Sequence, residues 1–431
     1  MEIFRALKYK NFRLLFVGQG ISVTGTWMQA VASGWLAYRL TNSPLVLGLV
    51  AFASQAPIFL LGPFGGVIAD RGNRRRILIV TQSIAMAQAV ILAFLTMTGR
   101  IEIWHLITLG IILGCVNSFD IPVRQAFVVD TVDNKEILGN AIALNSMMFN
   151  AARLIGPSMA GILIAMFGEG VCFLINALSF IAVLWSLLAM KIADRKKSPD
   201  GRGVIEGIKE GFLYVSRSLP MSHILSLLGV VSVMGASYSV LMPVFARDVL
   251  GGGPKTLGFL MSSAGVGAFA ATAYLASRKT VLGLGRTIAI CSSIFALSLV
   301  TFAFSRNVAT SMVILAVTGF GIMAHMAASN TILQTIADDD KRGRVMSFYT
   351  MAFIGTAPIG SLLAGILASA IGASNTLIVG GTVSFLGSMI FAMKLPAIRK
   401  ATHPIYRKMG IIPEVARGLD SVTEFSRPPE D

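Results

Sequence analysis

The stretch Gly66-Val67-Ile68-Ala69-Asp70-Arg71-Gly72-Asn73-Arg74-Arg75-Arg76 separates two long apolar runs, at about residues 44–69 and 77–98. One acid and four arginines cannot lie in hydrocarbon, so this stretch is predicted to be a short solvent-facing turn between two membrane helices. Its glycines allow the helices to approach closely, and its arginines indicate the cytoplasmic side of the membrane.

The composition extends this prediction to the whole chain. Of 431 residues, 55% are hydrophobic and only 13% are charged, and the mean hydropathy is +0.74. Several apolar runs exceed the roughly 18 residues that indicate a spanning helix. The fold class expected is therefore an all-α polytopic membrane protein. No cleavable signal is expected, because the first apolar run is too long and follows a basic start.

The net charge of +15 is distributed in a way that excludes nucleic acid as the partner. On the topology below, 30 of the 36 Lys and Arg residues fall on one side of the predicted membrane. This asymmetry places both termini in the cytoplasm and predicts contact with anionic lipids. The expected location is the cell (inner or plasma) membrane. The three cysteines have no metal-ligand spacing, so neither a metal nor a cofactor is expected.

The apolar runs predict twelve membrane helices, six on each side of a charged linker. Four regions are expected: a bundle at 1–190, a cytoplasmic linker at 191–220, a second bundle at 221–395 and a disordered cytoplasmic tail at 396–431. Within the linker, Ile205, Ile208, Phe212 and Val215 recur at helical spacing. That pattern predicts an amphipathic helix on the membrane surface; an ordinary linker helix is the alternative.

Two short sequence matches indicate that the bundles arose by duplication. Ser43–Gly48 at the start of the second helix matches Gly253–Gly258 at the start of the eighth, and Ala160–Leu163 recurs as Ala364–Leu367. The two offsets are nearly equal. Two parallel six-helix repeats are typical of transporters that bind substrate between the halves near the bilayer midplane.

The turn Gly66-xxx-Asp70-Arg71-xx-Arg74-Arg75 resembles the signature between helices 2 and 3 of the major facilitator superfamily. Asn73 stands where the family has a third glycine, and the matching turn at Ser277 lacks the acid. The phrases Phe173–Phe180, Gln334…Arg342–Ser347 and Pro358–Gly365 resemble the branch that holds the enterobactin exporter and macrolide-efflux proteins. The resemblance covers about residues 5–395. It implies a secondary transporter, with a monomer as the working unit and protons as the coupling ion.

The segment Ala152–Gly161 is similar to the family's antiporter motif Gly-Pro-x-x-Gly-Gly, carried here by Gly156, Pro157 and Gly161, with Ala160 replacing one glycine. The resemblance implies export rather than uptake. Physically, Pro157 removes a backbone hydrogen bond while small neighbours admit a partner helix, which gives a kinkable segment. Ordinary small-residue packing is the alternative interpretation.

The family resemblance also implies that Gly66, Asp70, Arg71, Arg74 and Arg75 form a conformational latch between the halves. A carboxylate at a helix end can pair with arginine or with the N-terminus of another helix, and rocking of the halves would break that contact. The alternative is that these charges only fix the topology.

Arg153 is predicted to lie roughly 18 Å from the cytoplasmic end of the fifth helix, near mid-bilayer. Such an arginine costs at least about 2.5 kcal/mol to insert and usually faces a cavity or a partner. Arg153 is expected either to bind an anionic substrate or to pair with Asp120. In a third possibility, Asp120 pairs with Arg124, four residues further along its own helix.

Other polar residues are candidates for the substrate cavity or for coupling. The first helix carries a stripe of polar residues at helical spacing, which must face other helices or water: Gln19, Ser22, Thr26, Gln29 and Ser33. Asn145 is a further candidate for the cavity. His325 is the one histidine deep in a predicted span and is a candidate proton carrier, although packing is the commoner role for such a residue.

The sequence thus predicts a secondary active exporter of a small siderophore-like or drug-like molecule, amphipathic or anionic, that works by alternating access. Two alternatives remain, namely a lysophospholipid or other lipid transporter and a non-transporting receptor or assembly protein. An ATP-driven pump is disfavoured, because the chain has no phosphate-binding loop. A membrane enzyme is disfavoured because paired acids and a histidine cluster are absent.

Overall fold

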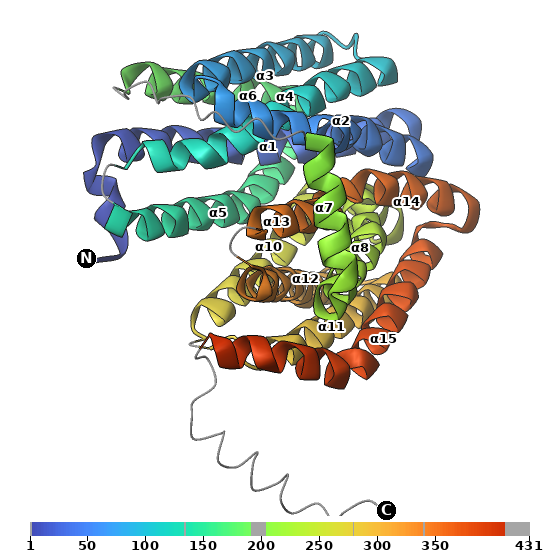
Figure 1. Ribbon diagram of the computed structural model, residues 1–431. Helices are drawn as coiled ribbons and strands as arrows, with labels where there is room; N and C mark the ends of the chain where they lie inside the picture. Colours follow the sequence, from blue (N-terminus) through green and yellow to red (C-terminus); the bar gives the residue numbers. More distant parts are fainter. Residues whose placement is uncertain (1, 133–134, 191–203, 279, 339–340, 410–431) are drawn as a thin grey trace, which may run out of the picture.

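We describe the protein from a computed structural model, which covers residues 2–132, 135–190, 204–278, 280–338 and 341–409 (Figure 1). The described part is all helical. Eleven of its helices are long and apolar enough to cross a membrane. The first half begins with the 3-10 helix η1 (Glu2–Lys8), followed by α1 (Lys10–Thr41), α2 (Pro44–Arg71), α3 (Arg74–Met97), α4 (Ile103–Asp130), α5 (Lys135–Phe167) and α6 (Glu169–Ala189).

The second half contains helices interrupted by two π-helical turns, η2 and η3. Its elements are α8 (Leu219–Val240), α9 (Met242–Val244), η2 (Phe245–Val249), α10 (Pro254–Ala276), α11 (Leu284–Phe304), α12 (Val308–Ile336), α13 (Arg342–Thr350), η3 (Met351–Gly355), α14 (Ala357–Ile371) and α15 (Ala373–Lys408).

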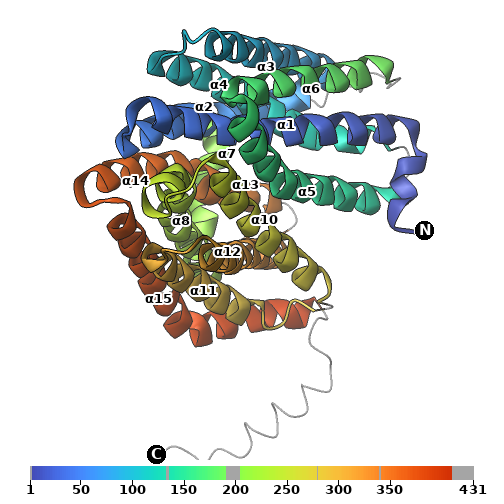
Figure 2. The same cartoon turned by 180° about the vertical axis from the view of Figure 1, so that it is seen from behind.

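The all-α polytopic prediction is confirmed, and the helices are arranged as two bundles (Figures 1 and 2). The same packing recurs in each bundle. In the first half α2 packs on α4, α1 on α6 and α3 on α6; in the second, α10 packs on α12, α8 on α15 and α11 on α15. This equivalence agrees with the internal repeat in the sequence. The count of twelve spans and the cytoplasmic side of the termini stay predictions.

α1 is the helix that the count of eleven omits. Although it runs from Lys10 to Thr41, its polar stripe lowers its hydropathy. Gln19, Ser22 and Gln29 of that stripe are buried, because α1 packs against α5 and α6. The stripe therefore faces other helices, one of the two environments that the sequence allowed.

The predicted boundary between the last helix and the tail is wrong. α15 continues beyond Pro396, where the tail was predicted to start, to Lys408, and Ile398 and Tyr406 are buried in the core of the second half. The rest of the tail, 410–431, lies outside the described residues. In the linker, α7 (Val204–Arg217) is helical as predicted, while 191–203 are not described.

α7 packs on the second half rather than standing alone. The Phe212 and Phe348 rings lie 6.3 Å apart, and Arg344 pairs with Glu210 at 2.6 Å. Tyr214 also donates a hydrogen bond to Asp338 at 3.0 Å. The linker helix is thereby fixed to α13 and to the end of α12. Whether it lies on a membrane surface stays a prediction.

Candidate functional site

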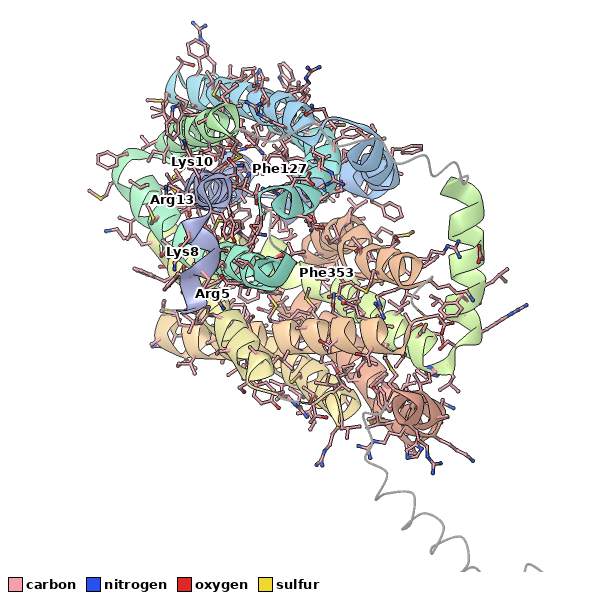
Figure 3. The ribbon with its side chains drawn as sticks, turned by 60° about the vertical axis from the view of Figure 1, so that its left-hand side comes forward. Arg5, Lys8, Lys10, Arg13, Phe127 and Phe353 are labelled. Carbon is pink, nitrogen blue, oxygen red and sulfur yellow. The ribbon has the colours of Figure 1, made fainter. Side chains whose placement is uncertain are left out.

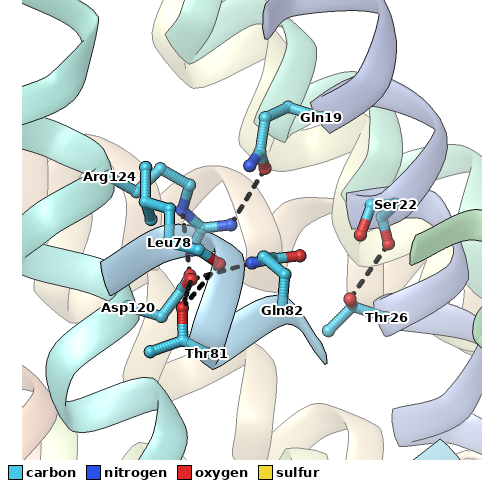
Figure 4. Close-up of polar contacts among 8 residues, drawn as sticks. All are labelled: Gln19, Ser22, Thr26, Leu78, Thr81, Gln82, Asp120 and Arg124. Carbon is cyan, nitrogen blue, oxygen red and sulfur yellow. Dashed lines mark hydrogen bonds and ion pairs between the residues drawn. The ribbon is translucent and has the colours of Figure 1, made fainter. Parts of the chain in front are cut away.

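A buried polar cluster surrounds Asp120 in the first half (Figure 4). The side chain of Asp120 is 3% exposed. Its Oδ1 accepts hydrogen bonds of 2.8 Å from Thr81 and from Gln82 of α3. Its Oδ2 lies 3.5 Å from Nε of Arg124, one helical turn further along α4. Asp120 thus pairs with Arg124, as the third alternative from the sequence held, and the predicted Arg153–Asp120 pair does not form.

Arg124 links this cluster to α1. Its Nη1 donates to Oε1 of Gln19 at 3.1 Å, and its guanidinium lies 5.1 Å from the centre of the Phe149 ring on α5. The Gln19 amide nitrogen and the Gln82 amide oxygen are buried without a hydrogen-bond partner. Four helices, α1, α3, α4 and α5, therefore meet at one charged centre. At this centre one amide donor and one amide acceptor make no hydrogen bond.

A second buried network lies further along α1 and contains no charge. Gln29 donates to Gln88 of α3 at 3.0 Å and accepts from Asn176 of α6 at 2.7 Å. Gln88 donates in turn to the carbonyl of Leu109 on α4 at 3.3 Å. Gln29 thus joins helices of one half. Thr26 is exposed, and its hydroxyl donates to its own helix at Ser22.

Arg153 lies on α5 where the first half meets the second. The Ser262 hydroxyl of α10 donates to the carbonyl of Leu154 at 2.8 Å, and a Cβ at Gly265 would lie 3.2 Å from the carbonyl of Arg153. The half-buried Arg153 side chain places its guanidinium 5.9 Å from the Trp27 ring centre. Among the described residues, no carboxylate pairs with this guanidinium.

The antiporter-like motif forms part of this seam between the halves. Gly156 packs on α1, where a Cβ would lie 2.6 Å from Cβ of Trp27. One turn later, Gly161 meets Gly258 of α10; a Cβ on Gly258 would lie 2.5 Å from the carbonyl of Pro157 and 3.0 Å from Cα of Gly161. α5 and α10 can approach this closely only because both positions are glycine.

The same contact recurs on the other side of the molecule. A Cβ on Gly48 of α2 would lie 2.6 Å from the carbonyl of Ser361 and 2.9 Å from Cα of Gly365 on α14. Gly48 corresponds to Gly258 in the sequence repeat, and Gly365 corresponds to Gly161. The two short matches found in the sequence are therefore the two crossing points that hold the halves together.

A polar group joins the halves at the end of α1, beyond these glycines. The Tyr38 hydroxyl donates a hydrogen bond to Asp248 of η2. Arg247 donates to the side-chain oxygen of Asn42 at 2.7 Å, and its guanidinium lies 5.9 Å from the Tyr38 ring centre. We call these four residues the clasp. They fix the ends of α1 and η2 to each other.

The predicted latch residues make contacts inside the first half. Arg74 bonds to Asp130 of α4 at 2.9 Å, and Arg75 donates to the carbonyls of Leu187 and Leu188 at the end of α6. Gly66 is half-buried within α2. The side chains of Asp70 and Arg71 lie outside the described residues, and their role in a latch stays a prediction.

Neither of the two remaining candidates, His325 and Asn145, is among the residues that contact Arg153. His325 of α12 is fully buried; its ring nitrogens make no hydrogen bond of good geometry, although the backbone of Ile288 on α11 lies close enough to interact with the ring. Asn145 is half-buried on α5.

Sequence reasoning missed several residues of these clusters: Thr81, Gln82, Gln88, Tyr38, Arg247 and Asp248. The first three are polar residues inside an apolar run, which is the one signal that could have indicated them. For the clasp residues, we find no such signal in the sequence.

Comparisons with known proteins agree with this architecture. The model of the transmembrane secretion effector family matches residues 2–420. The chain is 28% identical to the staphyloferrin A transporter of Staphylococcus aureus, over 85% of this chain and 92% of that one. It is 22% identical to the multidrug efflux pump Tap of Mycolicibacterium fortuitum, over 90% and 95% of the two chains. It is also 22% identical to macrolide efflux protein A of Streptococcus pyogenes, over 91% of this chain and 98% of that one.

Solved structures share the fold at low sequence identity. A POT family transporter crystallised with 5-aminolevulinic acid has a TM-score of 0.72 at 13% identity, covering 90% of this chain and 96% of that one. A bacterial homologue of the lysosomal transporter Spinster has a TM-score of 0.66 at 13% identity, covering 93% and 98%. The sequence-based resemblance is confirmed. This chain is a member of the transmembrane secretion effector family of the major facilitator superfamily.

Proposed function

We propose that this chain is a proton-coupled antiporter that exports an anionic, amphipathic organic molecule, and that Arg153 holds the anionic group. The observation that carries the proposal is the guanidinium of Arg153 beside Trp27, without a carboxylate partner among the described residues. Inserting an arginine in the middle of a span is costly, so an arginine that is found there usually has a function. Its planar set of donors matches a carboxylate or phosphate in two-point contact.

The position of Arg153 supports this role. Substrates of two-bundle transporters bind between the halves near the midplane, and the backbone at Arg153 and Leu154 touches α10 of the opposite half. An aromatic plane next to a cation favours a ligand that carries both an anionic group and an apolar or aromatic body. The relatives that transport a siderophore and drugs are compatible with a molecule of that kind.

The contacts between the halves support alternating access. Tyr38, Asn42, Arg247 and Asp248 form the clasp at the predicted extracellular end, and the two glycine crossings lie next to it. We infer that this arrangement is the cytoplasm-facing state. Outward opening must then separate the clasp, while Asp70 is proposed to latch the cytoplasmic end once it closes.

Two xanthene dyes of similar shape and opposite charge test the substrate class. In cells loaded with carboxyfluorescein or rhodamine 123, we expect this chain to accelerate export of the anionic dye only. Arg153→Gln should abolish that export and Arg153→Lys should retain part of it, because lysine keeps the charge without the planar donors. Export of rhodamine 123 alone, or full export of carboxyfluorescein by Arg153→Gln, would contradict the proposal.

Coupling is tested separately in inverted membrane vesicles with an imposed proton gradient. Uptake of carboxyfluorescein into these vesicles should follow the gradient and should stop when a protonophore collapses it. Asp70→Asn should lower the rate at equal expression without changing the gradient dependence. Uptake that continues unchanged after the protonophore would exclude proton antiport and leave the anionic substrate class standing.

A further inference from the structure

Two arginines of the first half lie against aromatic rings, and both pairs involve the same face of α5. The Arg124 guanidinium is 5.1 Å from the centre of the Phe149 ring, and the Arg153 guanidinium is 5.9 Å from the centre of the Trp27 ring. Phe149 and Arg153 are four residues apart on α5, so they lie on one side of that helix, about 6 Å apart along its axis. Arg124 of α4 thus reaches α5 one turn before Arg153.

The ion pair with Asp120 leaves donors of Arg124 unused. Its closest contact to Asp120 is through Nε, at 3.5 Å, and its Nη1 donates to Gln19 (Figure 4). Within the described part of the chain, Nη2 makes no hydrogen bond. Asp120 already accepts two hydrogen bonds of 2.8 Å from other side chains. Arg124, whose side chain is 18% exposed, can therefore contact a second anion while Asp120 stays hydrogen-bonded.

A polar side chain beside Arg124 also lacks a partner. Gln19 is buried, and its amide oxygen accepts from Arg124 while its amide nitrogen makes no hydrogen bond. A buried donor without an acceptor costs free energy. A carboxylate held by Arg124 is the kind of acceptor that this donor lacks.

A shared core holds these helices in place. Phe12 of α1, Phe127 of α4 and Leu144 of α5 are all buried in it, and Figure 3 shows Phe127 inside the first half. Phe127 lies three residues after Arg124, and Leu144 lies five residues before Phe149. The position of Arg124 relative to Phe149 is therefore fixed by packing, which lowers the cost of ordering the site when a ligand binds.

The geometry points to a second anion subsite at Arg124, next to the one proposed at Arg153. The exported molecule then carries two anionic groups, joined by an apolar or aromatic body that packs on Phe149 and Trp27. From Phe149 to Arg153, α5 rises about 6 Å, and from Gln19 to Trp27, α1 rises about 12 Å. The two anionic groups are therefore about 6–12 Å apart. This inference rests on the proposed function, because Arg153 must hold one of the two groups.

Three naphthalene carboxylates test the number and the spacing of the anionic groups. Naphthalene-2,6-dicarboxylate (the spaced dicarboxylate) has its carboxylates at opposite ends of the ring system, naphthalene-2,3-dicarboxylate (the adjacent dicarboxylate) has them on neighbouring carbons, and 2-naphthoate has one carboxylate. Binding to the purified full-length chain is measured by equilibrium dialysis with naphthalene fluorescence as the readout. The wild-type chain should bind the spaced dicarboxylate at least about tenfold more tightly than either of the others, because one more charge-assisted hydrogen bond contributes about that factor.

Single variants assign each carboxylate to its arginine. In Arg124→Gln the preference for the spaced dicarboxylate over 2-naphthoate should disappear, whereas Arg153→Gln should weaken binding of all three ligands about tenfold. Phe149→Leu keeps the ion pair of Arg124 with Asp120 and should reduce the preference about twofold to fivefold. The matched control Arg399→Gln removes the same charge from an exposed position on α15 and should keep the wild-type preference.

A double variant separates loss of the subsite from damage to the fold. Asp120→Asn/Arg124→Gln removes both charges together, so that no buried carboxylate is left without its arginine. It should lose the preference while its elution and thermal unfolding stay close to those of the wild-type chain. A preference for the spaced dicarboxylate that survives in this variant and in Arg124→Gln would overturn the second subsite.

The wild-type chain distinguishes failure of this inference from failure of the proposed function. Equal binding of the three ligands, weakened in Arg153→Gln, would overturn the second subsite and leave the proposed function standing. Binding of 2-naphthoate that Arg153→Gln does not change, or no binding of any of the three ligands, would contradict Arg153 as the anion site and would overturn both.

Discussion

The two halves share their packing but differ in what they bury. In the first half, Asp120 and Glu169 are buried acids, each paired with an arginine. Among the described residues, the second half buries no acid, and its buried contacts between side chains join hydroxyl groups, as in Thr318 to Ser298 at 2.9 Å and Ser305 to Ser311 at 2.8 Å. Duplication has thus preserved the surfaces where helices cross, while the chemistry inside each bundle has diverged.

The second half differs in backbone as well. Both π-helical turns, η2 and η3, belong to it, and such turns are frequent at functional sites. The Ser232 hydroxyl donates to the carbonyl of Phe353 in η3 at 2.6 Å, which satisfies an acceptor within the widened turn. We infer that the first half is stiffened by charge pairs, and that the second half contains the segments whose helical geometry can change.

The largest effect is expected where a buried charge loses its partner. Asp120→Ala leaves Arg124 with a mostly buried guanidinium, 18% exposed, and without its ion pair. Breaking a buried pair in this way typically costs about 3–5 kcal/mol. Denaturation of the purified protein in mixed micelles would measure the change. The double variant Asp120→Leu/Arg124→Met should recover most of the stability, and a single variant as stable as wild type would contradict the charge-pair interpretation.

The sequence could predict the helices and the internal repeat, because both depend on local patterns. Apolar runs locate spans whatever surrounds them, and repeated small residues mark positions where backbones touch. Gly48 and Gly258 belong to the segments that repeat in the sequence, and the structure adds that both lie where the halves cross. The amphipathic pattern at 204–218 likewise agrees with α7.

The partners of the charged residues could not be predicted in the same way, because they depend on how neighbouring helices rotate about their axes. Asp120 had two candidate arginines in the sequence, and only the packing of α3 and α4 places Thr81 and Gln82 on its carboxylate. The extension of α15 also depends on tertiary contacts. Burial of Ile398 and Tyr406 compensates for Pro396 and Pro404, which would otherwise favour a helix end.

An intermediate effect is expected at the glycine crossings, and it should be alike in both halves. A Cβ at Gly258 would lie 2.5 Å from the Pro157 carbonyl, and one at Gly48 would lie 2.6 Å from the Ser361 carbonyl. Gly258→Ala and Gly48→Ala should each cost about 1–3 kcal/mol, because a backbone cannot rotate away as a side chain can. Thermal unfolding of the purified variants would measure both losses.

The matched control for these variants is Gly139→Ala on α5, where no atom lies within 4 Å of the new methyl group. It should leave stability unchanged or raise it by up to about 1 kcal/mol, because alanine favours a helix interior. A large loss at Gly258 with none at Gly48 would show that packing has diverged along with chemistry. The two halves would then differ in how their helices cross as well as in the side chains that they bury.

The smallest effect is expected at His325, although a buried histidine in a transporter invites a proton-carrying role. Its side chain is fully buried, and its one polar neighbour is the backbone of Ile288, with which it makes no hydrogen bond of good geometry, so the imidazole contributes mainly packing in this state. His325→Phe should change stability by less than about 1 kcal/mol, because it removes at most one poorly aligned hydrogen bond together with buried polar atoms. Proton-driven uptake of carboxyfluorescein should keep the wild-type dependence on the gradient.

A variant that folds normally but transports carboxyfluorescein independently of the proton gradient would contradict this expectation and would place proton coupling in the second half.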